Sequence, residues 1–176
     1  MNHRISAHHC PWHIGANSIQ EGTPEAESFQ AGLQEACTYL ARCIAKDGEG
    51  ATRLIEVTVE GAQTLTDARI AARTVAGSTL FKSAVHGSDP NWGRVVAAIG
   101  RSGAEVVESQ IDVFLDSLCL MRAGHPQPFD KEGARALLSA KEVSVRVNLN
   151  LGEAEATAWG CDLSEEYVTL NSAYTT

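Results

Sequence analysis

Residues 46–55 of the chain read KDGEGATRLI, and this stretch divides a predicted helix from a predicted strand. The glycines on either side of Glu49 permit backbone angles that other residues avoid, and they let a ligand approach the backbone closely. Asp47 and Glu49 follow the helix end, where the helix dipole disfavours carboxylates by roughly 0.3–1 kcal/mol. The residues alone leave two alternatives open, a solvated turn and a binding loop, and a bare DGEG would favour the turn.

The helix before this stretch begins at Thr23-Pro24, where an N-cap residue precedes proline in the first turn. Apolar residues then recur at a spacing that predicts one buried helical face, and they are Phe29, Leu33, Cys37, Leu40 and Ile44. After the stretch, apolar and polar residues alternate from Arg53 to Glu60, which predicts a half-buried strand.

The rest of the chain alternates between helical and strand patterns. Helices are predicted at 64–75, at 94–99 after an Asp89-Pro90-Asn91 turn, and after Asp130; strands are predicted at 111–115, 118–121 and 143–151. We expect residues 153–160 to pair with 143–151 through a short turn at Gly152, and 124–129 to form a surface loop. Residues 78–85 fit either a helix or a strand, and the polar residues 164–176 predict a frayed tail. These patterns predict an α+β fold with layers and antiparallel pairing.

Composition limits the classes of function. The 176 residues carry a formal net charge of −8, which argues against nucleic-acid and anionic-membrane partners because both need basic surfaces. No apolar run approaches the length of a membrane span, and the amino terminus lacks the apolar core of a secretory signal. The five cysteines (10, 37, 43, 119 and 161) are scattered and odd in number, which is typical of free thiols in a reducing cytoplasm.

Residues 1–22 differ from residues 23–176. The first segment holds four of the six histidines together with Cys10. Zinc binding is the minority interpretation because the HHCPWH run (residues 8–13) lacks the paired ligand spacing of a structural site. We therefore expect no metal site and an irregular, His-rich leader ahead of the folded region.

No complete catalytic motif is present. The chain contains no nucleophile elbow, phosphate loop, HExxH helix or dinucleotide fingerprint. Arg94 has two open interpretations: its guanidinium could bind a carboxylate in two-point fashion, or it could brace the preceding turn through Asp89.

Three stretches together resemble the ornithine acetyltransferase (ArgJ) family. They are KDGEGATRLI (46–55), HGSDPNWGRVVAAIG (86–100) and WGCDLSEEYVTLNSAYTT (159–176). All three occur in the family's order, and the resemblance runs from about Phe29 to Thr176. It implies the carboxy-terminal part of the layered α/β sandwich of ArgJ/DmpA-like proteins. A related amidase or aminopeptidase of the same general fold is a weaker alternative.

The resemblance also implies an activity. Members of the family transfer an acetyl group from N2-acetylornithine to glutamate without a cofactor, and some use acetyl-CoA as a co-substrate. They cleave themselves into α and β chains, and the exposed threonine of the β chain is the nucleophile. The alanine-threonine-methionine-leucine cleavage motif is absent here, so this chain resembles a carboxy-terminal β-chain portion without a catalytic residue. The implied partners are an α chain and the rest of the β chain, in a heterotetramer of two α and two β chains.

Three residues match the family's substrate contacts by their position in the motifs: Glu49, Asn171 and Thr176. A carboxylate at Glu49 suits the ammonium group of ornithine, and the amide and hydroxyl suit the amine and carboxylate of an amino acid. We expect the chain alone to be inactive, and a non-catalytic structural or partner-binding fragment remains the alternative function.

Overall fold

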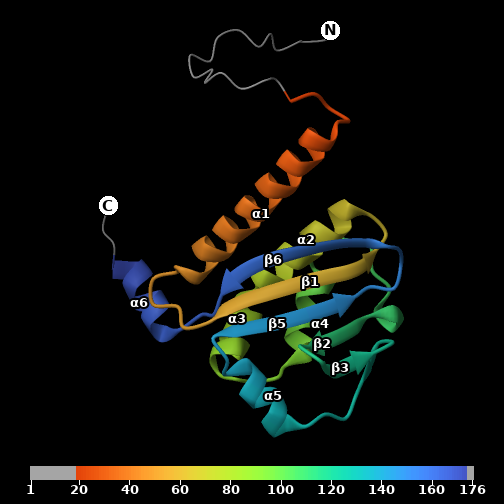
Figure 1. Ribbon diagram of the computed structural model, residues 1–176. Helices are drawn as coiled ribbons and strands as arrows, with labels where there is room; N and C mark the ends of the chain where they lie inside the picture. Colours follow the sequence, from red (N-terminus) through yellow and green to blue (C-terminus); the bar gives the residue numbers. More distant parts are fainter. Residues whose placement is uncertain (1–18, 174–176) are drawn as a thin grey trace. The chain divides into compact units, whose positions relative to one another are not determined.

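The computed structural model describes residues 19–173. The chain divides into two compact units, Met1–Thr38 and Tyr39–Thr176. The described part of the first unit holds most of helix α1 (Pro24–Lys46), whose start and end agree with the sequence prediction. The second unit holds the sheet and all the other helices that the structure describes (Figure 1).

One mixed sheet forms the centre of the second unit, in the order β4-β3-β2-β5-β1-β6. Its strands are β1 (Leu54–Ala62), β2 (Asp112–Leu115), β3 (Leu118–Arg122), β4 (His125–Pro126), β5 (Glu142–Asn148) and β6 (Ala154–Cys161). β1 pairs with β5 in parallel, while the remaining pairs are antiparallel. The prediction of antiparallel pairing was therefore wrong for the β1–β5 pair. β4 lies within the predicted 124–129 loop.

The prediction that residues 153–160 pair with 143–151 was also wrong. The strand exists as β6, but it pairs with β1, with Leu54 opposite Cys161 and Val57 opposite Ala158. The chain between β5 and β6 crosses the end of β1 instead of closing a hairpin, because Leu151 N and Gly152 N both donate to Gly61 O, at 2.7 and 3.0 Å. Apolar alternation predicts a strand but not its neighbour in the sheet.

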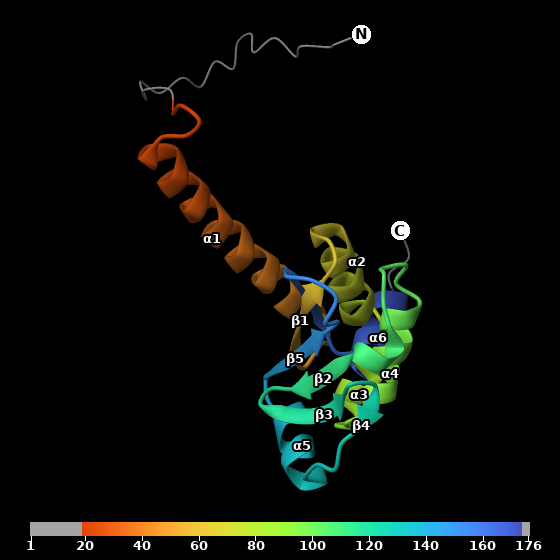
Figure 2. The ribbon, with the colours of Figure 1, turned by 90° about the vertical axis from the view of Figure 1, so that its right-hand side faces the viewer.

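Three helices pack on one face of the sheet: α2 (Leu65–Ala76), α3 (Thr79–His86) and α4 (Trp92–Gly100). Figure 2 shows α2 and α4 on the same side of the strands. Thr64 caps α2 by accepting a hydrogen bond from Asp67 N, as the sequence predicted. Small residues let α2 approach the sheet closely, and Ala68, Ala71 and Ala72 are all fully buried.

The core lies between these helices and the inward-facing residues of the central strands. Ile55, Val57 and Val59 of β1 have no exposed surface. At about 25 cal/mol per Å² of apolar surface removed from water, such side chains each contribute roughly 1.5–3 kcal/mol to folding. A fourth helix of this unit, α5 (Lys131–Leu138), begins after Asp130, whose side chain accepts from Glu132 N. A short 3₁₀ turn, η1 (Glu108–Gln110), leads into β2.

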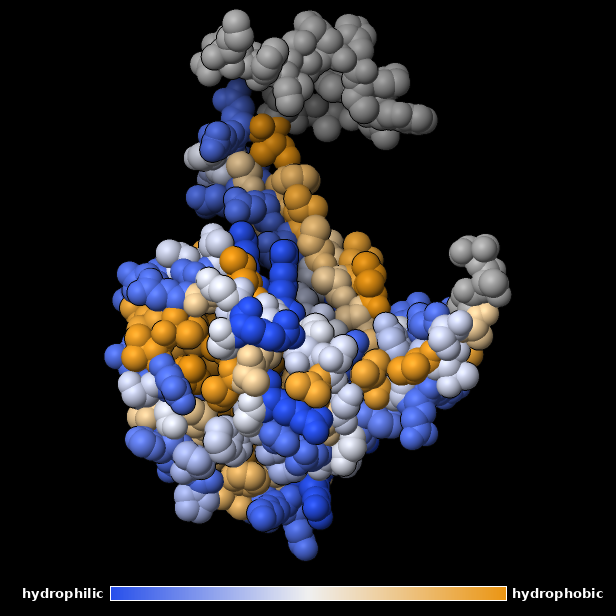
Figure 3. Space-filling model, turned by 180° about the vertical axis from the view of Figure 1, so that it is seen from behind, coloured by the Kyte–Doolittle hydropathy of each residue, from blue (hydrophilic) through white to orange (hydrophobic). Residues whose placement is uncertain are grey.

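The predicted buried face of α1 is exposed. Phe29, Leu33, Leu40 and Ile44 have exposed fractions of 58, 52, 57 and 77%, and no described residue of α1 is buried. Figure 3 shows apolar residues following one side of this helix. Helical spacing of apolar residues predicts an amphipathic helix, but it does not say whether another part of the same chain covers the apolar side.

The carboxy-terminal region corrects another prediction. Residues Glu165–Ala173 form helix α6 instead of a frayed tail. Ser164 explains the helix start, because its hydroxyl accepts a hydrogen bond from Tyr167 N at 2.8 Å, and this satisfies one backbone donor of the first turn. Within residues 19–173, the cysteines are free thiols and no helix is long and apolar enough to cross a membrane.

Candidate functional site

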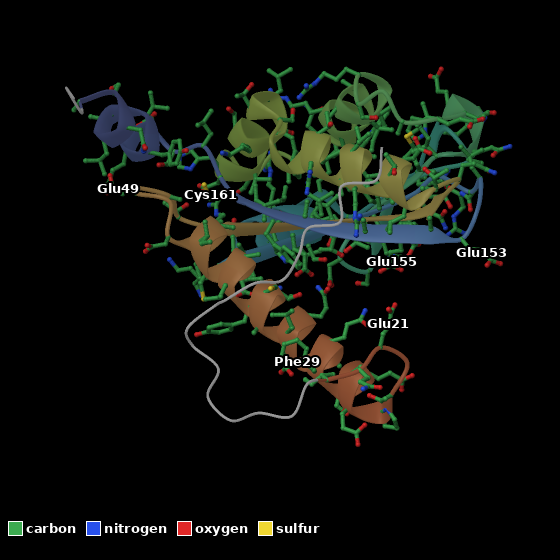
Figure 4. All side chains as sticks on the ribbon, turned by 90° about the horizontal axis from the view of Figure 1, so that it is seen from above. Glu21, Phe29, Glu49, Glu153, Glu155 and Cys161 are labelled. Carbon is green, nitrogen blue, oxygen red and sulfur yellow. The ribbon has the colours of Figure 1, made fainter. Side chains whose placement is uncertain are left out.

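The first and third quoted motifs come together at one end of the sheet. The loop Gly48–Arg53, between α1 and β1, packs against residues 161–171, which run from the end of β6 into α6. Figure 4 shows Glu49 on this loop beside α6, with Cys161 close by, and Glu153 at the opposite end of β6. Residues more than 100 positions apart in the sequence therefore form one structure around Glu49.

Both glycines beside Glu49 are needed for this packing. A Cβ atom on Gly48 would lie 2.9 Å from Cys161 Sγ, and one on Gly50 would lie 2.6 Å from Tyr167 N. Gly50 also has a positive φ of 77°, a conformation that side chains disfavour. Ser164 Oγ donates to Gly50 O at 2.5 Å. The loop is therefore pressed against the start of α6 on both sides of Glu49.

A buried carboxylate, Asp162, holds the other end of the loop. Its Oδ1 accepts from Thr52 N at 2.7 Å and from Arg53 N at 2.9 Å, and its Oδ2 accepts from Thr52 Oγ1 at 2.7 Å. Asp162 is fully buried. Burial alone raises the pKa of this carboxyl, but the hydrogen bonds from His86, Thr52 and Arg53 outweigh that effect, so its pKa lies below the usual value.

The second motif joins the same cluster through His86, the last residue of α3. Its Nδ1 lies 2.8 Å from Asp162 Oδ2. Arg53 reinforces the contact, because its Nη1 donates to the carbonyl oxygens of Val85 and His86. All three motifs that carry the family resemblance therefore meet at the Gly48–Arg53 loop.

Two of the three predicted site residues are brought together there. Asn171, on α6, directs its Nδ2 to the backbone oxygen of Glu49 at 3.5 Å and to Tyr167 O at 2.8 Å. The side chains of Glu49 and Asn171 are both exposed, so a ligand can reach them. Thr176 lies outside the described residues.

Comparison with known proteins gives the same family that the three motifs resemble. A sequence model of the ArgJ family matches residues 11–176. The chain belongs to the ArgJ family. This match extends further toward the amino terminus than the three motifs, from which the resemblance was placed at about Phe29 onward.

Individual ArgJ relatives agree. The chain is 51% identical over 162 residues to the arginine biosynthesis bifunctional protein ArgJ of Symbiobacterium thermophilum, covering 92% of this chain and 40% of the relative. It is 51% identical over 148 residues to the ArgJ of Dehalococcoides mccartyi, covering 84% of this chain and 36% of that protein. The chain thus spans two fifths or less of the length of these two relatives.

A solved structure shows the fold. The crystal structure of the arginine biosynthesis bifunctional protein ArgJ from Bacillus halodurans aligns with a TM-score of 0.87 at 42% identity, covering 90% of this chain and 75% of that one. The predicted fold class, an α+β layered sandwich of the ArgJ type, is therefore confirmed.

A groove of about 530 Å³ opens beside the Glu49 loop of this ArgJ chain. Ile44, Trp159 and Tyr167 give it apolar walls, while Arg73 and Lys82 bring positive charge. Lys82 Nζ lies 5.1 Å from the centre of the Tyr167 ring, within the range of a cation–π contact. The groove therefore combines apolar walls with two positive charges.

The structure shows a different contact for Arg94 from the predicted turn brace. Its Nη1 donates to Leu80 O at 2.7 Å and so ties α4 to α3, whereas the Asp89 carboxylate accepts from Asn91 Nδ2 at 3.1 Å. Binding of a ligand carboxylate by Arg94 stays a prediction. Among residues 19–173, no cluster of three or more His, Cys, Asp or Glu side chains is placed to hold a metal. The His-rich segment considered for zinc lies almost entirely outside the described residues.

Sequence reasoning missed three residues of the site: His86, Asp162 and Ser164. Asp162 and Ser164 are two of the three buried polar residues in the described structure. Their signal in the sequence was their place inside the quoted motifs. Nothing in the spacing separated them from their neighbours, because their role depends on contacts across 32 to 114 residues of sequence.

Proposed function

We propose that this chain supplies part of the substrate-binding site of an enzyme that transfers an acetyl group from N2-acetylornithine to glutamate. The observation that carries the proposal is the meeting of the three motifs around the exposed Glu49. The ArgJ family is an acetyltransferase family of arginine biosynthesis, and the motifs that identify it contact one another at one loop here.

The chemistry proposed for the complete enzyme has two displacement steps. A threonine hydroxyl attacks the acetyl carbonyl of N2-acetylornithine, an acetyl-threonine ester forms, and ornithine leaves as the amine. The amine of glutamate then attacks the ester, N-acetylglutamate forms, and the threonine hydroxyl is restored. Dividing one difficult transfer in this way is the general advantage of covalent catalysis. The threonine and the oxyanion donors would come from parts of the family protein other than this chain, and acetyl-CoA is an alternative acetyl donor.

Glu49 and the groove would bind the amino-acid part of the substrate. The Glu49 carboxylate suits a substrate ammonium group, and a hydrogen bond to a charged partner contributes roughly 1.5–3 kcal/mol. Asn171 lies next to Glu49 and offers both a donor and an acceptor. Arg73 and Lys82 in the groove suit a substrate carboxylate. The negative charge of Glu49 and the positive charges of the groove suit a substrate that carries both an ammonium group and a carboxylate, as N2-acetylornithine and glutamate do.

The proposed partners are the α chain and the remaining β-chain residues, in an assembly of two α and two β chains. This chain covers 75% of the crystallised Bacillus halodurans polypeptide but 40% of the Symbiobacterium thermophilum relative. The crystallised polypeptide is therefore much shorter than that relative, which agrees with a precursor divided into two chains. The apolar face of α1 is a surface that the other parts would cover.

The test compares two carboxylate variants in the reconstituted enzyme, made by co-producing this chain with the α chain and the remaining β-chain residues of a family member. Glu49→Gln removes the charge at the site, and Glu153→Gln removes an exposed charge at the far end of β6 (Figure 4). We expect Glu49→Gln to lower kcat/KM for N2-acetylornithine by about tenfold or more, and Glu153→Gln to leave it unchanged.

The chain is also tested alone with N2-acetylornithine and glutamate, and N-acetylglutamate is followed by mass spectrometry. We expect no product, because an acyl-enzyme route needs an activated nucleophile beside a base. Turnover by the chain alone would show that the nucleophile lies within it. Equal activity of Glu49→Gln and Glu153→Gln would exclude the proposed role of Glu49. Failure of the reconstituted enzyme to turn over would favour the non-catalytic, partner-binding alternative.

A further inference from the structure

Asp162 is a buried ionised group that the proposed acetyl transfer does not itself use. Among residues 19–173 it is the one charged side chain that is buried, with 0% exposure. Removing a carboxylate from water is costly unless hydrogen bonds replace the lost solvation. An apolar residue of similar size would fill the space without that cost. The buried carboxylate therefore indicates a specific role for Asp162.

Both carboxylate oxygens of Asp162 make hydrogen bonds to neighbouring segments of the chain. Oδ1 accepts from two consecutive backbone amides, Thr52 N and Arg53 N. Oδ2 accepts from Thr52 Oγ1, and it lies 2.8 Å from His86 Nδ1. The consecutive amides belong to the loop that carries Glu49, three residues before Thr52. The carboxylate therefore acts on the backbone of the proposed binding loop.

The contact with His86 determines where the imidazole carries its proton. An ionised carboxylate only accepts hydrogen bonds, so Nδ1 of His86 must be the donor. Arg53 Nη1 in turn donates to the carbonyl oxygens of Val85 and His86, which ties the end of α3 to the same loop. His86 is thereby linked to the loop directly through its backbone carbonyl and, by way of Asp162, through its side chain.

We propose that Asp162 and His86 are a positioning pair that fixes the Gly48–Arg53 loop and, through it, the direction of the Glu49 carboxylate. The pair does not touch substrate. Asp162 holds the loop at Thr52 and Arg53, Ser164 holds it at Gly50, and Glu49 lies just before these attachments. The importance of the pair for acetyl transfer rests on the proposed function, but its control of the loop does not.

The first part of the test reads the imidazole of His86 directly. Nitrogen-15 spectra of the purified full chain, recorded at alkaline pH, are expected to show a ring protonated at Nδ1. Asp162→Asn keeps the shape of the side chain but can place an NH₂ donor where Oδ2 was. His86 Nδ1 must then accept, so the proton is expected to move to Nε2. A wild-type ring protonated at Nε2 would overturn the pairing.

The second part measures amide hydrogen exchange in two His86 variants. His86→Leu removes the donor, and we expect the amides of Ala51, Thr52 and Arg53 to exchange roughly tenfold faster or more. His86→Asn keeps a donor close to the position of Nδ1, so it is expected to restore slow exchange. The exposed His125 provides the matched control, because His125→Leu is expected to leave these amides unchanged.

A comparison with the core separates positioning from general stability. The amides of Val145 and Val147 in β5 are expected to keep their exchange rates in His86→Leu. Equal acceleration of the loop and of β5 would show a merely structural role and would overturn the proposal, as would an unchanged loop. If the loop loosens as expected while Glu49→Gln leaves the reconstituted enzyme unaffected, the positioning pair stands and the proposed function of Glu49 fails.

Discussion

Substituting Gly50 by alanine tests the contact on which the candidate site depends. Gly50 has a φ of 77°, and a Cβ atom there would lie 2.6 Å from Tyr167 N and 2.7 Å from the carbonyl carbon of Glu166. Both are backbone atoms, so no side chain can rotate out of the way. Gly103 is a matched control, because its φ is 82° but a Cβ atom there would meet nothing within 4 Å.

The two variants separate backbone strain from collision. A left-handed conformation costs an alanine roughly 1–2 kcal/mol, and the lower entropy of the unfolded chain changes equally in both variants. Gly50→Ala must in addition displace the start of α6. That displacement breaks the hydrogen bond from Ser164 Oγ to Gly50 O and the packing around it, at a cost of about 0.5–1.5 kcal/mol for the hydrogen bond alone. We expect a loss of about 1–2 kcal/mol for Gly103→Ala and about 2–4 kcal/mol for Gly50→Ala.

The measurement is urea unfolding of the purified chain, followed by circular dichroism, with the free energy of unfolding extrapolated to water. Amide exchange in α6 gives a second reading, because the displaced helix is expected to lose protection in Gly50→Ala and to keep it in Gly103→Ala. Equal free energies for the two variants, with α6 unaffected in both, would refute the packing of the loop against α6. The geometry around Glu49 would then need another explanation.

Three further predictions concern single residues. Asp162→Asn is expected to be less stable than wild type at neutral pH, and the difference should shrink as pH falls below the ordinary aspartate pKa of 3.8. The folded pKa of Asp162 is lowered, so its contribution to stability is present above that value and is lost on acidification. Urea unfolding at a series of pH values measures this change. Thr64→Ala removes the cap of α2 and should cost about 1 kcal/mol in the same assay. Arg42→Met breaks the ion pairs to Glu56 and Glu142, which are partly exposed. We therefore expect the free energy of unfolding to fall by less than about 1 kcal/mol, and by less still in high salt. A larger loss that salt does not change would contradict this.

The sequence was sufficient for most helices and strands because their signals are local. The cap at Thr64 and the alternation from Arg53 to Glu60 each lie within a few residues, and the structure confirms both elements. The partner of β6 depends on where the chain crosses the sheet at Gly61, which no local pattern records. The start of α6 depends on Ser164, whose hydroxyl also binds Gly50 across 114 residues.

The candidate site was predictable to the extent that motifs mark it. Glu49 and Asn171 were chosen by their place in two motifs, and the structure brings them together, although their roles in binding remain predictions. The hydrogen bonds that meet at Asp162 were not predictable. Where no periodic apolar pattern surrounds an aspartate, the sequence does not show whether that aspartate is buried or exposed. The apolar face of α1 shows the converse limit, since its pattern is clear in the sequence while its residues are exposed in the described structure.

The position of β1 determines the order in which this chain can fold during synthesis. β1 is hydrogen-bonded on both sides, and its partners come much later, with Leu54 opposite Glu142 on one side and opposite Cys161 on the other. A ribosome therefore releases β1 long before either neighbouring strand exists, and contacts this distant in sequence form slowly. Until then Ile55, Val57 and Val59 have no sheet to complete, and exposed apolar strands of this kind are prone to aggregation. The Glu49 loop completes its contacts later still, because Asn171 follows Glu49 by 122 residues.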